Sequence, residues 1–402
     1  MTTIDAAAAS APDAPDAALA DRELALDRSG WGRRFHLVQW RNLGFWLYAF
    51  LVGWGVLALL QLTLPGTQIA QGSLAATSAI FALYAIPFVL FFRHLDRFDT
   101  VPGPLALAAF VWGGFAATAV IAVHGNDALH SLYAEAFGAG FAINWGNALS
   151  APFNEELGKA AGLLLLVLLA PRLIRTAFDG LLVGSFLGLG FQVVENVIYG
   201  FRGGSSGFDI DNVGAAIHSA VMRMGVGVFS HWLYSGIFCA GLIWFLGRPD
   251  EPAKRLRGVV LMAIAMLTHG LWDAASGMLN TSIFFLPISY LLVPLTLVFT
   301  YRWIYKTSVI TERDWAKAVL APEVAAGVAT QAEVDAFAGS RKERKAYVHS
   351  AAHHKGHVGA RHVLAALGDL LHALSRSGGE DSAEVSRSRD EILRVRGTTP
   401  LP

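Results

Sequence analysis

The stretch that decides the fold is APFNEELGKAAGLLLLVLLA, residues 151–170. It has the length and the apolar content of a membrane-crossing helix, which needs about 20 mostly apolar residues. Yet it begins with Glu155 and Glu156 side by side, and Lys159 follows one turn later. A carboxylate in hydrocarbon is costly unless it is compensated, so charged residues in a span indicate a functional site by default.

The composition of the whole chain is that of a membrane protein. Of its 402 residues, 54% are hydrophobic and only 15% are charged, and the mean hydropathy is +0.46. Soluble proteins of this size carry far more charge. A lone Cys239 excludes a disulfide or a thiolate metal site within one chain. The net charge of zero argues against nucleic acid as a partner.

Hydropathy predicts an all-α fold, a polytopic bundle of about eight transmembrane helices. The stretch 131–150 contains Glu135 and two Asn, and we interpret it as an interfacial or re-entrant segment. The expected spans are residues 44–64, 72–92, 104–123, 151–170, 180–200, 226–246, 258–276 and 283–304.

Basic residues orient these spans. Lys and Arg are concentrated before the first span and after the second, fourth, sixth and eighth, while the opposite loops are poor in them apart from Arg202 and Arg223. Because basic loops stay in the cytoplasm, we expect a multi-pass protein of the plasma membrane with both termini cytoplasmic.

Three regions are expected along the chain. Residues 1–40 are predicted to be a disordered, basic N-terminus, residues 41–306 the transmembrane domain, and residues 307–402 a small cytoplasmic helical tail, partly disordered. The tail contains a dense run of histidines that we interpret as a solvated surface, because neighbouring Lys and Arg would repel a metal ion. This run comprises His349, His353, His354, His357 and His362.

Ionisable residues recur in four consecutive spans. With the orientation above, all lie in the outer half of the membrane. A helical rise of 1.5 Å per residue places each of them within roughly 5 to 15 Å of the outer interface. Polar residues spaced i,i+4 lie on one face of their helix, as with His269 and Asp273. We therefore expect one wet cavity shared by Glu155, Glu156, Lys159, Glu195, His231, His269 and Asp273.

Carboxylates and imidazoles in such a cavity can hold a divalent cation or activate a water directly, and both routes hydrolyse bonds. A catalytic zinc site uses three protein ligands and a water. His231, His269 and one of Glu195 or Glu156 would supply those ligands, and another Glu would be the base. Asp273 could hold a ring N–H or complete the coordination, and Lys159 would interact with the charge of Glu155.

Four motifs in order resemble the PrsW family of intramembrane proteases. They are EExxK at 155–159, FxxxExxxY at 191–199, Arg223 ahead of His231, and HxxxD at 269–273. The related CAAX protease and bacteriocin-processing superfamily ordinarily has His where this chain has Glu195, which favours PrsW. The resemblance implies peptide-bond hydrolysis in or near the membrane, with an anti-sigma factor or a similar single-span protein as substrate. It also implies a metalloprotease, although a metal-free glutamate mechanism is argued for the superfamily.

Two other classes of function stay open. A proton-coupled transporter also places carboxylates and His within the membrane, although no internal repeat relates the two halves of this chain. A catalytically silent scaffold could bind partner helices through the same groove, because a fold does not fix a function. Residue by residue, Glu155 with Lys159 could also be an interfacial ion pair, and a lone His could be a helix-bridging hydrogen bonder.

Overall fold

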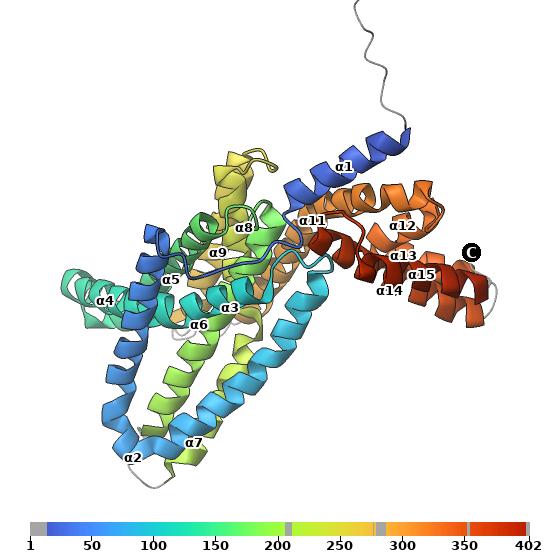
Figure 1. Ribbon diagram of the computed structural model, residues 1–402. Helices are drawn as coiled ribbons and strands as arrows, with labels where there is room; N and C mark the ends of the chain where they lie inside the picture. The colour runs from blue at the N-terminus through green and yellow to red at the C-terminus, as the bar shows by residue number, and fades with distance from the viewer. Residues whose placement is uncertain (1–13, 206–210, 276, 279–286, 352–353, 399–402) are drawn as a thin grey trace, which may run out of the picture. The chain divides into compact units, whose positions relative to one another are not determined.

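The computed structural model describes residues 14–205, 211–275, 277–278, 287–351 and 354–398, which are mainly helical and contain no strand (Figure 1). Its elements are α1 (Ala14–Ser29), α2 (Leu43–Leu95), α3 (Gly103–Val111), η1 (Trp112–Ala122), α4 (Val123–Phe137), α5 (Ala139–Leu169), α6 (Ala177–Ser205), α7 (Asn212–Val226), η2 (Gly227–Phe229), α8 (His231–Leu246), α9 (Arg255–Asp273), η4 (Ile288–Leu292), α11 (Val293–Ala325), α12 (Gln331–Ala338), α13 (Arg341–Ser350), α14 (His354–Ser377) and α15 (Ala383–Thr398).

The chain forms two compact units. One comprises residues 34–309, and the other combines residues 1–33 with residues 310–402. The division falls inside α11, close to residue 306, where the sequence analysis placed the end of the transmembrane domain.

The helices that are long and apolar enough to cross a membrane all begin in the unit 34–309. Seven are found by length and composition among the described residues, and α5, with 31 residues, has the length but carries three charged residues in its apolar part. With α5 they match the eight predicted spans. The seven are Leu43–Pro65, Ala70–Leu95, Gly103–Phe137, Ala177–Gly204, Asn212–Leu246, Arg255–Asp273 and Ile288–Ala325.

Several boundaries differ from the expectation. The first two spans form the single helix α2, bent where Ala70 leaves the helical conformation (φ −132°, ψ 37°). The stretch 131–150 is divided by Gly138, whose φ of 90° ends α4 before α5 begins. A loop was expected where α7 lies, and the sixth span is interrupted at Ser230. The end of the seventh span at residue 276 and the start of the eighth at 283–286 lie outside the described residues.

Helix α6 lies at the centre of this unit. Most of its residues are buried, and it packs along α8 and against α2 and η1. Gly188 allows the close approach to α8, because a Cβ atom there would lie 2.2 Å from the backbone oxygen of His231. Small residues let membrane helices pack with their backbones close together. The helix that carries Glu195 is thereby held directly against the helix that carries His231.

The other unit includes the N-terminal helix α1, so the prediction of disorder is wrong for residues 14–29. The guanidinium of Arg22 is buried, donating to the backbone oxygen of Val319 (2.8 Å) and to Glu323 Oε1 (2.7 Å). Trp31 packs edge-on against Trp315, with ring centroids 6.4 Å apart. Partners almost 300 residues away in sequence therefore order this helix.

Candidate active site

The structure brings all seven predicted site residues into one buried cluster. Helix α5 contributes Glu155, Glu156 and Lys159, α6 contributes Glu195, α8 contributes His231, and α9 contributes His269 and Asp273. Each helix is apolar on its remaining faces, so packing of these faces turns the polar groups toward one another.

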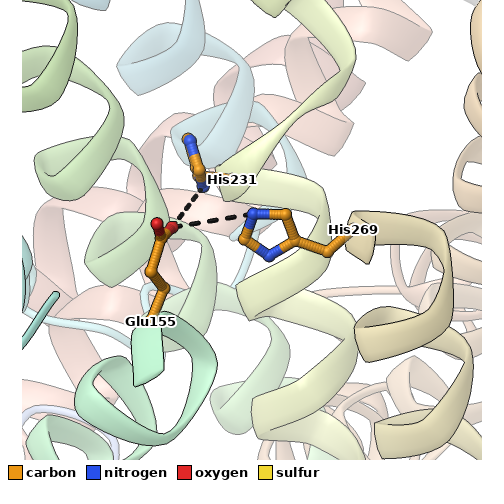
Figure 2. A group of neighbouring side chains, drawn as sticks. All are labelled: Glu155, His231 and His269. Atoms are coloured by element: carbon orange, nitrogen blue, oxygen red, sulfur yellow. Dashed lines mark ion pairs between the residues drawn. The ribbon is translucent and has the colours of Figure 1, made fainter. Parts of the chain in front are cut away.

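Glu155 lies between the two imidazoles (Figure 2). Its Oε1 accepts a hydrogen bond from Asn126 Nδ2 at 3.1 Å. Its Oε2 is buried and accepts no hydrogen bond, but it lies 3.6 Å from Lys159 Nζ, from His231 Nδ1 and from His269 Nε2. One carboxylate oxygen is thus fixed by the protein, and the other faces basic nitrogens.

In the neighbouring carboxylate, Glu156, both oxygens have hydrogen-bond partners. Its Oε1 accepts from Lys159 Nζ (2.9 Å) and lies 3.1 Å from His269 Nδ1, and its Oε2 accepts from Ser235 Oγ (3.0 Å). The side chain is fully buried and does not line the cavity described below. It therefore orients His269 and neutralises Lys159.

His231 is held in the same way by Glu195. Its Nε2 lies 3.1 Å from Glu195 Oε2, which also accepts from Arg223 at 2.8 Å, and its Nδ1 lies 3.1 Å from Lys159 Nζ. The Lys159 ammonium also lies over the Phe191 ring, 3.8 Å from the centroid. Because an ammonium has no acceptor, the hydrogen-bond partners assign the lone pair of neutral His231 to Nδ1 and its proton to Nε2.

His269 has two further neighbours. Asp273 Oδ2 lies 3.5 Å from its Nε2, and the Tyr234 ring stacks on the imidazole with centroids 4.5 Å apart and planes within 4°. The Tyr234 hydroxyl is buried and has no hydrogen-bond partner in the structure as described. A buried unpaired donor is costly, so this hydroxyl is available to a ligand.

These groups border a cavity of about 260 Å³ between α4, α5, α6, α7, α8 and α9. A water occupies about 30 Å³ in the liquid, so several waters or a peptide group fit. Among the side chains that line the cavity are Glu155, Glu195, Tyr199, Arg223, His231, Tyr234, His269 and Asp273.

Two contributors were not predicted from the sequence. Asn126, in α4, fixes Glu155 and is itself held by Asn154 Nδ2 at 3.0 Å. Tyr234 lies three residues after His231 and so shares its side of α8, the spacing that could have revealed it. Arg223, noted from its motif, pairs with Glu195 and lies 3.9 Å from the centroid of the Tyr199 ring.

The donor set fits a metal ion. Glu155, His231 and His269 each offer a ligand atom within 4.8 Å of the others, the one such group of three or more acids, His or Cys among the described residues. If Glu156 and Glu195 accept the ring N–H groups, the remaining lone pairs of both imidazoles face Glu155 Oε2. Lys159 Nζ already lies 3.1 Å from the His231 lone pair and 3.6 Å from Glu155 Oε2, and the remaining acceptors could hold a metal ion beside it. Carboxylates commonly hold metal-bound imidazoles through the second ring nitrogen, as Glu156 and Glu195 do here. Glu195, expected as a ligand, lies outside this group.

Comparison with protein-family models matches residues 101–301 to the PrsW family intramembrane metalloproteases. The match spans half of the chain and contains every residue of the cluster. Comparisons with curated proteins and with solved structures found no match. The chain belongs to the PrsW family.

Proposed function

We propose that this member of the PrsW family hydrolyses a peptide bond of a membrane-anchored protein in the cavity lined by Glu155, His231 and His269. The observation that carries the proposal is Glu155 Oε2, which is buried, accepts no hydrogen bond and lies 3.6 Å from a nitrogen of each imidazole. Membership of a protease family favours hydrolysis over transport or scaffolding.

The proposed metal ligands are Glu155, His231 and His269, and the proposed ion is zinc, which prefers carboxylate oxygen and imidazole nitrogen. Bound there, zinc would supply Lewis acid chemistry, polarising the scissile carbonyl and making water a better nucleophile. The sequence analysis expected Glu195 or Glu156 as the third ligand, whereas the proposed third ligand is Glu155, and Glu195 holds His231.

Asp273 is the proposed general base. It lines the cavity, and its side chain is 23% exposed, against 17% for Glu195 and 5% for Glu155. In the proposed reaction Asp273 takes a proton from the attacking water and returns it to the amide nitrogen as the C–N bond breaks. The Tyr234 hydroxyl donates to the carbonyl oxygen as negative charge develops there.

The proposed substrate is a single-span membrane protein similar to an anti-sigma factor, cut near the extracytoplasmic face of the plasma membrane. The resemblance to the family supports the substrate class, and the alternation of basic loops supports the location and the cytoplasmic termini. Lipid bilayer is the second expected partner.

A strain that carries Glu155→Gln tests the hydrolase. We expect one or more single-span membrane proteins to accumulate uncleaved in its membranes, as measured by quantitative proteomics. Asp127→Asn is the matched control, because Asp127 also lines the cavity but makes no contact with the cluster's imidazoles. A membrane proteome identical to the wild type would contradict the proposal.

Metal dependence is tested on purified protein by measuring zinc content beside cleavage, with and without a chelator. We expect chelation to abolish cleavage and added zinc to restore it. Full cleavage by a metal-free preparation would rule out zinc.

A further inference from the structure

A groove runs between α9 and α11, two helices labelled in Figure 1. It has a volume of about 800 Å³ and is separate from the catalytic cavity, with which it shares no lining residue. One end is basic and the rest is largely apolar. Its lining residues are Lys254, Arg255, Leu256, Arg257, Val260, Leu261, Ile264, Phe299, Thr300 and Trp303.

The basic end carries uncompensated charge. Lys254 is paired with Glu251, with Nζ 2.6 Å from Oε1. Arg255 is exposed, and neither it nor Arg257 has an acidic partner among the residues that the structure describes. Arg257 instead lies near two indole rings, 5.3 Å from the centroid of Trp303 in the groove. Two positive charges are therefore available to a ligand.

The apolar part extends from this end along both helices. Val260 is 47% exposed, Trp303 43% and Phe299 66%. Trp303 lies beside Arg257, and Phe299 lies one helical turn before Trp303 in α11. From Arg255 to Ile264 the helix rises about 13 Å. This is close to the thickness of the hydrocarbon in one leaflet, roughly 15 Å.

We infer that this groove binds an anionic phospholipid, with its phosphodiester against Arg255 and Arg257 and an acyl chain along Val260, Ile264 and Phe299. The positive end complements a headgroup with net negative charge, whereas a zwitterionic headgroup would bring its own cation to the two arginines. A soluble phosphate would leave the apolar floor uncovered. Basic pockets between membrane helices recognise anionic headgroups by this combination. The inference does not depend on the proposed protease activity.

The test is native mass spectrometry of the full-length protein in non-ionic detergent, titrated with phosphatidylglycerol or with phosphatidylcholine of identical acyl chains. We expect the wild type to retain phosphatidylglycerol in preference to phosphatidylcholine. Arg255→Gln with Arg257→Gln should weaken phosphatidylglycerol binding on the order of 30-fold, from about fivefold for each basic residue near a lipid surface. Phosphatidylcholine binding should change little.

The matched control removes two exposed arginines outside the groove, Arg34→Gln with Arg41→Gln, and should keep the preference. Phe299→Ala should weaken both lipids equally, because it removes acyl contact. The inference is overturned if the wild type shows no preference, if the control loses as much as the groove variant, or if glycerophosphoglycerol, which lacks acyl chains, competes as strongly as the lipid. Groove variants that change the oligomeric state but not lipid retention would indicate a protein occupant and overturn it as well.

Discussion

The variants Glu155→Gln and Asp273→Asn distinguish the two proposed roles in the site, since Glu155 is the proposed metal ligand and Asp273 the proposed general base. Glutamine keeps the hydrogen bond from Asn126 to Oε1 but removes a charge 3.6 Å from Lys159 Nζ. That loses Coulomb attraction on the order of 4 kcal/mol at an effective dielectric near 20. It also relieves the burial of a carboxylate, which costs several kcal/mol. The two terms nearly cancel, so we expect the free energy of unfolding to change by less than about 2 kcal/mol.

The two variants should differ in zinc content and in rate. Glu155→Gln loses a charged ligand, and we expect zinc occupancy to fall at least about tenfold and cleavage about a thousandfold or more. Asp273→Asn should retain its zinc while kcat falls about 10² to 10⁴-fold, the usual contribution of a general base. The assay is cleavage of the accumulated membrane protein by purified enzyme, with zinc measured by atomic emission and Asp127→Asn as control. Full zinc in Glu155→Gln, or wild-type kcat in Asp273→Asn, would refute these assignments.

The remaining predictions concern neighbouring groups and the second unit. Asn126→Ala should lower kcat about tenfold with little change in KM, because the hydrogen bond that fixes Glu155 is lost; Asn126→Gln, which keeps an amide, should recover part of the rate, and a change in KM alone would argue against positioning. Tyr234→Phe should lower kcat about 10 to 100-fold at unchanged zinc content, and an unaltered kcat would remove its hydroxyl from the reaction. In the unit 1–33 with 310–402, Glu323→Ala leaves buried Arg22 without its carboxylate and should lower the free energy of unfolding by about 3 to 5 kcal/mol. Arg22→Ala should lower it less, because Glu323 keeps a second arginine, Arg389. Hydrogen exchange of α14 in the full-length protein measures both losses, and equal losses would contradict the reasoning.

The all-α fold and the gathering of the site could be predicted because both follow from local rules. Apolar length gives spans, and the position of each charge within its span gives its depth. Glu155, Glu195, His231 and His269 share a depth, so four packed helices bring them to one place. The helix breaks beside Gly138 and Ser230 were missed because residues on both sides remain apolar enough to read as continuous or interfacial.

The assignment of individual roles could not be predicted from spacing. Glu155 and Glu156 are neighbours, so they point about 100° apart, and only the rotation of α5 decides which faces the cavity. That rotation is set by packing with other helices. The order in α1 is equally non-local, since the buried partner of Arg22 is Glu323. Neutral polar groups such as Tyr234 carry no charge signal that would single them out in an apolar span.

The contact at Gly188 has a consequence for how this protein can change over evolution. A methyl group at position 188 would lie 2.2 Å from the backbone oxygen of His231, whereas an ordinary contact of this kind is about 3.3 Å. A backbone carbonyl cannot relieve the clash by changing rotamer, as a side chain could. The backbone of His231 would have to retreat by about 1 Å, and misplacement of that size at a reacting centre costs on the order of a hundredfold in rate. The glycine hydrogen at position 188 thus sets the distance between α6 and α8 on which the chemistry depends. A larger residue at this position can be accommodated only if α8 moves away at the same time.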